Sequence, residues 1–250
     1  MKNIWISSQR SGVQPRMRLF CLPYAGSGAT VFRGWSEALP ADVEVCPIQL
    51  PGREQRFREQ PITDIATMVD VLAPALGDHL DIPFAFFGHS MGASIAYETA
   101  RRLLTTYSRA PKVLLVSGRQ APQLLPSRSP IHHLPDDAFV EKIRELNGTP
   151  SEVLEHPELL QFLMPQLRAD FKLAETYREL DGPRLTCPVV AFGGWEDDQV
   201  PPEQVEAWRE STSGPFTLHM LAGDHFFVTS EREHLLSLIA KELRHPAWRS

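Results

Sequence analysis

Six short runs of apolar residues recur along the chain, and helical patterns separate most of them. Apolar runs of this length, without polar residues in alternation, are typical of parallel strands that are buried on both faces. Strands that alternate with helices form βαβ units. The predicted strands are Met17–Leu22, Val43–Ile48, Phe84–Phe87, Lys112–Ser117, Pro188–Gly193 and Phe216–Leu221. We therefore predict an α/β fold with a doubly wound, mostly parallel sheet.

One segment breaks this alternation. Between Ser117 and Pro188, about 70 residues contain helical patterns but no convincing strand. A loop of that length without secondary structure is improbable. We therefore predict a helical lid insertion at about residues 119–185, within a single domain that spans residues 1–250. The predicted helices are Ile65–Leu80, Ala93–Thr105, Asp136–Leu146, Ser151–His156, Pro157–Phe162, Pro165–Leu180, Pro202–Glu210 and Glu231–Leu243.

The insertion is rich in apolar side chains. They could line a lid over the carboxyl edge of the sheet or pack the insertion onto the core, and the sequence leaves both roles open. These residues are Leu124, Leu125, Phe139, Ile143, Leu146, Leu154, Leu159, Leu160, Phe162, Leu163, Met164 and Phe171.

Composition excludes several classes of protein. A net charge of −6 argues against a nucleic-acid binder, which usually carries a basic patch. No run approaches the 18 apolar residues of a membrane span, and Met1–Arg18 lacks the apolar core of a signal peptide. The three cysteines show no C-x-x-C spacing, which favours buried thiols in a reducing compartment. We expect a cytoplasmic monomer without a metal site or a bound cofactor.

A serine flanked by glycines lies between a predicted strand and a predicted helix. The segment Gly88-His89-Ser90-Met91-Gly92 has the pattern G-x-S-x-G. In this context the glycines permit a tight turn that exposes the serine hydroxyl at the carboxyl end of the strand. We predict that Ser90 is a nucleophile. The alternative is a glycine-flanked turn with an idle serine.

A serine hydroxyl attacks well only when a base removes its proton, and a carboxylate fixes the tautomer of that base. Of the nine histidines, His225 follows the last predicted strand by a short loop and precedes the final helix. This places it at the carboxyl edge of the sheet, as the base requires. His89 adjoins the serine but is expected to point away from it. We predict His225 as the base.

The loop after the fifth predicted strand supplies the candidate acids Glu196, Asp197 and Asp198. Its pattern G-x-x-D-x-x-V-P resembles the acid loop of α/β-hydrolases and puts Asp197 in the position of the acid. Asp198 is the alternative. Asp224 is a fourth candidate, but its position beside His225 makes it difficult for its carboxylate to reach the imidazole ring.

Attack on a carbonyl creates an oxyanion, which backbone N–H groups must stabilise. One donor is predicted to be Met91, the residue after the nucleophile. The second is predicted to come from the glycine-containing loop Leu22–Gly28, with Ala25 as the chosen residue and Tyr24 as the alternative. This loop lacks the G-x-G-x-x-G and G-x-x-x-x-G-K-[ST] patterns of phosphate-binding loops.

With these parts identified, the chain resembles the type II thioesterases, the stand-alone editing enzymes of nonribosomal peptide and polyketide synthesis. The Leu-Pro-Gly-Arg run together with Gly-His-Ser-Met-Gly is more specific than either motif alone. The matching stretches extend over nearly the whole chain. They are Leu19–Gly26, Gln49–Glu54, Pro83–Ala93 and Gly223–Phe227.

The resemblance implies an α/β-hydrolase fold and hydrolysis of the thioester between an acyl group and the phosphopantetheine arm of a carrier domain. It implies Ser90, Asp197 and His225 as the catalytic triad, with Ala25 and Met91 as oxyanion donors. The expected partners are acyl or peptidyl carrier domains. Because carrier domains are usually acidic, arginines could help docking. The candidates are Arg53, Arg56, Arg58, Arg101, Arg102, Arg119 and Arg128.

Three other functions stay open. A carboxylesterase or lipase could use the same triad, although the Leu-Pro-Gly-Arg run argues against it. A cyclising thioesterase cut from a synthase is a second alternative. An inactive hydrolase fold that serves as a binding module is the third.

Overall fold

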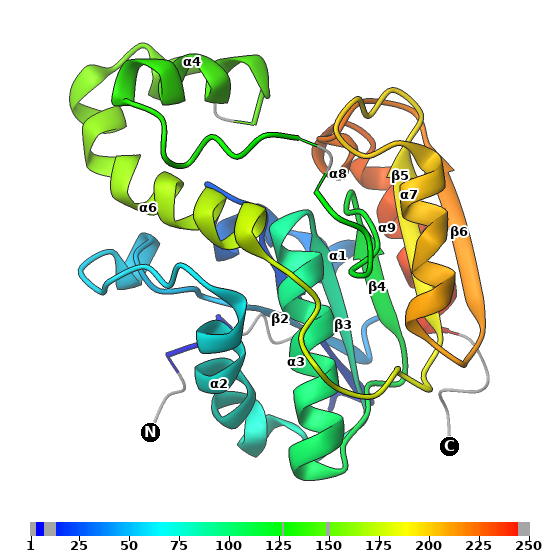
Figure 1. Ribbon diagram of the computed structural model, residues 1–250. Coiled ribbons are helices and arrows are strands. Elements are labelled where there is room, and N and C mark those ends of the chain that lie inside the picture. Colours follow the sequence, from blue (N-terminus) through cyan, green and yellow to red (C-terminus); the bar gives the residue numbers. More distant parts are fainter. Residues whose placement is uncertain (1–3, 8–13, 127, 149–150, 245–250) are drawn as a thin grey trace.

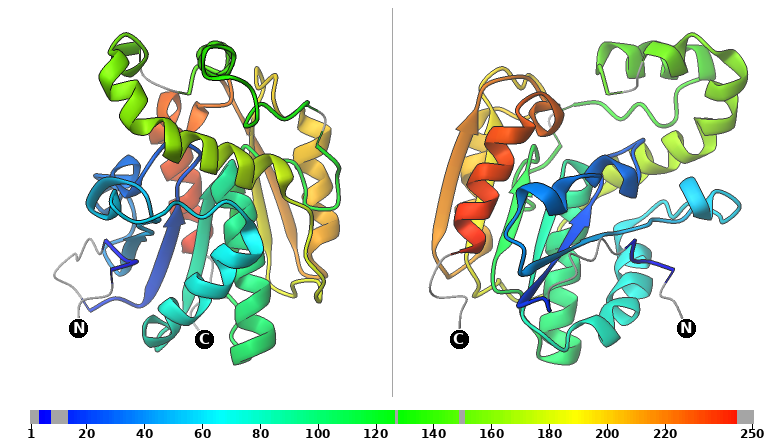
Figure 2. Two further views of the ribbon diagram at one scale, coloured as in Figure 1. Left: turned by 60° about the vertical axis from the view of Figure 1, so that its left-hand side comes forward. Right: turned by 180° about the vertical axis from the view of Figure 1, so that it is seen from behind.

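A six-stranded sheet runs through the protein with helices on both faces (Figures 1 and 2). The computed structural model describes residues 4–7, 14–126, 128–148 and 151–244, so the remaining positions of the predicted domain lie outside the described residues. The strand order is β2-β1-β3-β4-β5-β6, and every neighbouring pair is parallel. The strands are β1 Met17–Leu22, β2 Val43–Pro47, β3 Phe84–His89, β4 Leu114–Ser117, β5 Val189–Gly194 and β6 Phe216–Leu221. The predicted fold class is confirmed.

Each strand contributes side chains to two cores because successive residues point to opposite faces. On one face Phe20 and Phe86 pack against α2 and α3, and on the other face Leu19 and Phe87 pack against α1 and α9. The helices of the main body are α1 Trp35–Ala38, α2 Ile65–Leu76, α3 Met91–Tyr107, α7 Pro202–Glu206, α8 Phe227–Ser230 and α9 Arg232–Leu243. Short 3₁₀ turns lie at Ala29–Phe32, Glu54–Arg56, Gly77–His79 and Ala207–Ser211.

The segment between β4 and β5 contains α4 Asp136–Glu145, α5 Ser151–Leu154 and α6 Pro157–Thr176. Figure 1 shows α6 crossing above the carboxyl edge of the sheet, with α4 beyond it. The prediction of two helices that break before Pro165 is wrong, because α6 is one helix of 20 residues with Pro165 inside. Proline removes one helical hydrogen bond, but Leu163 and Leu167 on either side of it pack in one apolar cluster with α4. This shared packing explains why the helix continues.

The predicted end of this helix at Leu180 is also wrong, since α6 ends at Thr176. The chain beyond it is bound to a buried carboxylate on α3. Glu98 accepts hydrogen bonds from the Tyr177 hydroxyl at 2.6 Å and from the Leu180 N–H at 3.0 Å. These bonds hold the chain along α3 in place of a further helical turn.

Three observations relate to the expectations from composition, and they concern membrane-spanning helices, metal-binding clusters and the cysteines. Among the described residues, no helix is long and apolar enough to cross a membrane. Within the same residues, no group of three or more His, Cys, Asp or Glu side chains is placed to hold a metal ion. All three cysteines are free and buried, as predicted, and burial raises the pKa of Cys187 to about 12.

The start of α3 approaches the loop after β1 so closely that only glycine fits at position 92. A Cβ there would lie 2.3 Å from the Leu22 carbonyl oxygen and 2.7 Å from that of Pro23. We expect Gly92→Ala to lower the free energy of unfolding by about 1–3 kcal/mol, since backbone must move to admit the methyl group. Thermal or denaturant unfolding measures the change.

Gly77 provides the matched control. It has φ −47° in a helical conformation, and an added Cβ would meet no atom within 4 Å. Gly77→Ala should therefore leave stability unchanged or raise it by about 0.4–1 kcal/mol. Equal destabilisation by both substitutions would contradict the steric argument.

Candidate active site

The serine of the G-x-S-x-G segment lies in a tight turn between β3 and α3. Ser90 has φ 51° and ψ −116°, a conformation that costs energy for any residue except glycine. Its N–H donates to the Ser117 carbonyl at 2.8 Å, which ties the turn to β4. A Cβ at Gly88 would lie 2.2 Å from the Gly92 carbonyl oxygen, so both glycines of the motif are required by sterics. The turn thus holds the Ser90 side chain at the carboxyl edge of the sheet.

Ser90, His225 and Asp197 form one hydrogen-bonded chain. The Nε2 atom of His225 lies 3.0 Å from the Ser90 hydroxyl oxygen, and its Nδ1 atom lies 2.8 Å from Asp197 Oδ2. Because a carboxylate only accepts, Nδ1 carries the proton and Nε2 of the neutral ring is free to accept one. The Asp197 side chain is fully buried, and its other oxygen accepts from the N–H groups of Gln199 and Val200. The carboxylate is therefore fixed before any substrate binds.

The other candidate acids make no hydrogen bond to the His225 ring. The Asp198 side chain is 83% exposed and pairs with Arg128 at 3.2 Å. Asp224 accepts from the Phe226 N–H at 2.8 Å, and Glu196 accepts from the Gly223 N–H at 2.6 Å. The structure thus decides between the two adjacent aspartates, because Asp197 hydrogen-bonds to the imidazole and Asp198 does not.

The backbone donors proposed for an oxyanion lie beside the serine. Within the described part of the chain, the N–H groups of Tyr24, Ala25 and Met91 donate to no protein acceptor. The Tyr24 carbonyl accepts from the Ser27 N–H at 3.1 Å and from the Ser27 hydroxyl at 2.7 Å. Since C=O and N–H point in opposite directions across a trans peptide, the Ala25 N–H points out of this turn.

His89 is a buried neighbour that the sequence did not assign to the site. Its Nδ1 lies 2.9 Å from the Ser117 hydroxyl, and its ring packs against those of Tyr24 and His225. Burial, and then repulsion from His225 whenever that ring is protonated, hold the pKa of His89 well below its ordinary value, so the His89 ring is neutral. A Cβ at Gly118 would lie 2.5 Å from the His89 ring. His89 therefore packs beneath the His225 ring and makes no hydrogen bond to Ser90.

A cavity of about 790 Å³ opens above the serine. Ser90 and His225 lie on its floor, and Ile143, Leu146 and Phe171 of the insertion line its upper wall. The apolar residues of the insertion therefore divide into four groups, of which these wall residues are the first. Phe139, Leu154, Leu160, Leu163 and Met164 pack within the insertion, Leu124 packs on the main core, and Leu125, Leu159 and Phe162 are exposed.

Sequence similarity identifies the family. The chain matches the thioesterase domain family over residues 17–243. It belongs to the thioesterase family. Thioesterases are hydrolases, so the chain belongs to a family of hydrolases.

Three similar proteins illustrate the range of this thioesterase's relatives. The linear gramicidin dehydrogenase LgrE of Brevibacillus parabrevis is 46% identical over 243 residues, which cover 96% of this chain and 92% of LgrE. The gramicidin S biosynthesis protein GrsT of Aneurinibacillus migulanus is 42% identical over 242 residues, which cover 97% of this chain and 94% of GrsT. The solved type II thioesterase BorB, from the borrelidin biosynthetic cluster, is 37% identical with a TM-score of 0.87, and 98% of each chain is covered.

The name of LgrE refers to a dehydrogenase, but the loop after β1 in this chain does not suit a dinucleotide. A dinucleotide-binding fold carries G-x-G-x-x-G between its first strand and first helix. The corresponding segment here is Leu22-Pro23-Tyr24-Ala25-Gly26-Ser27-Gly28, which lacks the pattern.

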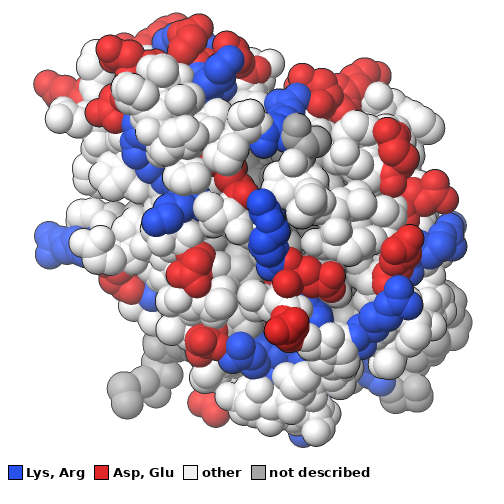
Figure 3. Space-filling view, viewed as in Figure 1, with Lys and Arg blue, Asp and Glu red and all other residues white. Residues whose placement is uncertain are grey.

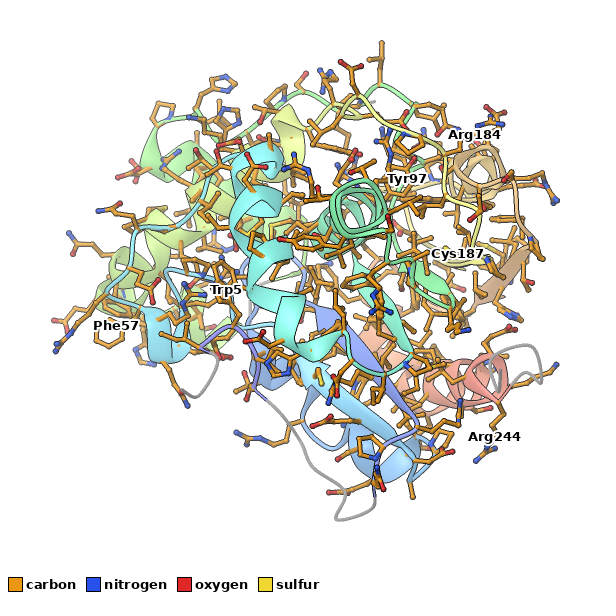
Figure 4. The ribbon with its side chains drawn as sticks, turned by 90° about the horizontal axis from the view of Figure 1, so that it is seen from below. Trp5, Phe57, Tyr97, Arg184, Cys187 and Arg244 are labelled. Atoms are coloured by element: carbon orange, nitrogen blue, oxygen red, sulfur yellow. The ribbon has the colours of Figure 1, made fainter. Side chains whose placement is uncertain are left out.

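The prediction of an arginine-rich docking rim is wrong for Arg53, Arg56 and Arg101, because all three are buried. Arg53 pairs with Asp170, Arg101 pairs with Glu98, and Arg56 pairs with Glu59. The Arg56 guanidinium also lies 4.0 Å from the centre of the ring of Trp5, a residue labelled in Figure 4. These side chains hold loops together and cannot present positive charge to a partner.

The remaining arginines of that set are dispersed. Arg102 pairs with Asp70, Arg128 with Asp198, and Arg58 lies over the exposed ring of Phe57 at the outer edge of the molecule in Figure 4. Burial lowers the pKa of Arg119, which donates to the Ala174 carbonyl of α6 at 2.8 Å. On the face in Figure 3, basic and acidic side chains alternate without a continuous basic patch.

The contrast between the two adjacent aspartates can be measured. We expect Asp197→Asn to lower kcat for a thioester by roughly 10³–10⁴-fold, because an amide cannot hold the same His225 tautomer. Asp198→Asn should change kcat by less than about twofold, since its side chain is exposed and pairs with Arg128. Steady-state hydrolysis by both purified variants tests the assignment, and the reverse order of effects would contradict it.

Proposed function

We propose that this protein is a serine thioesterase that removes acyl groups from the phosphopantetheine arm of carrier domains in nonribosomal peptide or polyketide synthesis. The observation that carries the proposal is the hydrogen-bonded chain Ser90–His225–Asp197 on the floor of a lidded cavity. Membership of the thioesterase family and similarity to proteins of such pathways support the choice of substrate. Release of misprimed or stalled acyl groups is the proposed role.

In the first half of the reaction, the Ser90 oxygen attacks the thioester carbon while His225 Nε2 takes the hydroxyl proton. Asp197 stabilises the imidazolium that forms. The carbonyl oxygen becomes an oxyanion, which accepts hydrogen bonds from the Ala25 and Met91 N–H groups. The carbon–sulfur bond then breaks, the imidazolium protonates the departing pantetheine sulfur, and an acyl-serine ester remains.

In the second half, water replaces the pantetheine arm. His225 takes a proton from the water as its oxygen attacks the acyl-serine carbon, and the same N–H groups stabilise the second oxyanion. The bond to Ser90 breaks, its oxygen recovers the proton from His225, and the carboxylic acid leaves. Each proton that His225 accepts is returned within the same half-reaction, so the enzyme is regenerated.

The wall of the cavity suits an acyl chain. Ile143, Leu146 and Phe171 offer apolar contacts above the serine. Four charged residues at the same cavity are paired, Lys142 with Glu145 and Arg128 with Asp198. An apolar acyl group therefore gains contacts there without leaving these charges unpaired.

The nucleophile can be tested against a serine on the helix that follows it, α3. We expect Ser90→Ala to lower hydrolysis of an acyl-carrier substrate by at least about 10³-fold, because no acyl-serine can form. Ser94→Ala is the matched control. Ser94 is 1% exposed, and its hydroxyl lacks a hydrogen-bond partner among the described residues. Its loss should leave kcat unchanged, and near-normal activity of Ser90→Ala would refute the mechanism.

The substrate class requires a separate comparison. The wild-type enzyme should hydrolyse an acyl group on a carrier domain with a higher kcat/KM than the same acyl group on free pantetheine or in a simple oxygen ester. Recognition of the carrier adds binding energy that the small substrates lack. A higher kcat/KM for the oxygen ester would favour a carboxylesterase, and the absence of any advantage from the carrier would contradict the proposed partner.

A further inference from the structure

A buried carboxylate of the lid helix binds the loop that carries the proposed oxyanion donor. Asp170 of α6 is 1% exposed, and its Oδ2 atom accepts from the Gly26 N–H at 2.8 Å. Gly26 directly follows Ala25. Leu167, one turn earlier on α6, lies against the same glycine, since a Cβ at Gly26 would be 2.9 Å from a Leu167 methyl carbon. The lid helix therefore contacts the turn at its third residue.

The hydrogen bond from Gly26 selects one orientation of this turn. Gly26 has φ 81°, the positive value that a type II turn requires at its third residue, and the Ser27 N–H closes the turn on the Tyr24 carbonyl. The peptide between Ala25 and Gly26 is the unit that flips between type I and type II turns. An acceptor fixed in front of the Gly26 N–H holds that peptide in one of the two orientations. The Ala25 N–H belongs to the preceding peptide, which the Tyr24–Ser27 hydrogen bond orients, so Asp170 acts on this N–H by holding the whole turn in position.

Arg53, from the Leu-Pro-Gly-Arg run, keeps the Asp170 carboxylate in place. Its two terminal nitrogens donate to Asp170 at 2.9 and 2.6 Å, and one of them also donates to the Ser27 carbonyl at 2.9 Å. Both side chains are almost completely buried. A buried carboxylate is costly without such a partner, and a bidentate pair also fixes its orientation. The arginine thus binds the carboxylate and the far end of the same turn.

Glu54, the next residue, adds a second attachment. It accepts from the Thr30 N–H at 3.0 Å, just beyond the turn. Arg53 and Glu54 therefore bind the loop after β1 at Ser27 and just beyond it at Thr30, which explains the position of this run within the structure.

Resting on the proposed function, we propose that Asp170 is a positioning residue for catalysis. Its carboxylate, held by Arg53, orients the turn Tyr24–Ser27 so that the Ala25 N–H faces the oxyanion formed at Ser90. The lid helix is in this way a structural part of the oxyanion site. A purely structural ion pair would stabilise the fold without a selective effect on the transition state.

Three substitutions separate these roles. Asp170→Ala removes the acceptor for Gly26, and we expect kcat to fall by about 10²-fold, the effect of misplacing a group by roughly 1 Å. Asp170→Asn keeps an oxygen that can accept from the Gly26 N–H, so its kcat should fall by less than about tenfold. Arg53→Lys keeps the charge but loses the bidentate geometry and should resemble Asp170→Asn.

Glu98→Gln is the matched control. Glu98 and Arg101 form another buried ion pair, 2% and 6% exposed, and bind the chain after α6 to the α3 helix that also bears the labelled Tyr97 (Figure 4). Glu98→Gln should lower the melting temperature and leave kcat unchanged well below that temperature. An Asp170→Ala variant with a similar loss of melting temperature should still show its loss of kcat.

A transition-state probe gives the selective readout. An alkyl trifluoromethyl ketone adds to Ser90 and places an oxyanion where the thioester oxyanion forms. Asp170→Ala should raise its inhibition constant by about the factor by which kcat/KM falls. The dissociation constant of an intact acyl thioester, measured in a Ser90→Ala background, should stay within about twofold.

The outcomes distinguish this inference from the proposed function. If Ser90→Ala is inactive but Asp170→Ala, Asp170→Asn and Arg53→Lys lose no more kcat than Glu98→Gln, the positioning role is overturned and the thioesterase mechanism stands. If Ser90→Ala keeps its activity, the mechanism itself fails. If Asp170→Ala does not fold, the inhibition constants of the Asn and Lys variants decide between the two roles.

Discussion

The geometry of the site depends on the approach of two backbone segments, the first turn of α3 and the loop after β1. The missing side chain of Gly92 lets the Leu22 and Pro23 carbonyls lie where a Cβ would otherwise stand. Since β1 and β3 are neighbours in the sheet, both segments leave it at the same edge. Tyr24 and Ala25 consequently line the same cavity as Ser90, the residue that precedes Met91. Side chains refine this arrangement, but backbone packing creates it.

Buried ion pairs lie where the insertion contacts the main body of the protein. Asp170 binds Arg53 and the loop after β1, while Glu98 binds Arg101 and the chain that leaves α6. Buried ion pairs add little net stability, but breaking one is costly because the remaining charge is stranded. Such pairs therefore specify position more than they stabilise the fold. The distal part of the insertion, around Leu163, is held by apolar contacts, which are less directional.

Local pattern was sufficient for the sheet but not for contacts between distant residues. The apolar runs predicted all six strands to within about two residues, because burial on both faces leaves a direct trace in sequence. The predicted helix break before Pro165 is wrong, since packing on α4 compensates for the lost helical hydrogen bond. Arg53 was assigned to the surface because nothing near it shows that its partner lies 117 residues away. The choice between Asp197 and Asp198 likewise needed the fold, as adjacent residues point in different directions from one loop.

Helix α6 contacts both the cavity and the loop after β1, because helical periodicity places four of its residues on one side. Leu167, Asp170, Phe171 and Ala174 follow the spacing that places residues on one side of a helix. Phe171 and Ala174 line the cavity, whereas Leu167 and Asp170 contact the turn at Gly26. A displacement of α6 would therefore also displace the acceptor of the Gly26 N–H. Under the proposed mechanism, α6 cannot adjust to a substrate without altering the turn Tyr24–Ser27, so the fit of the acyl group and the placement of the backbone donors depend on each other.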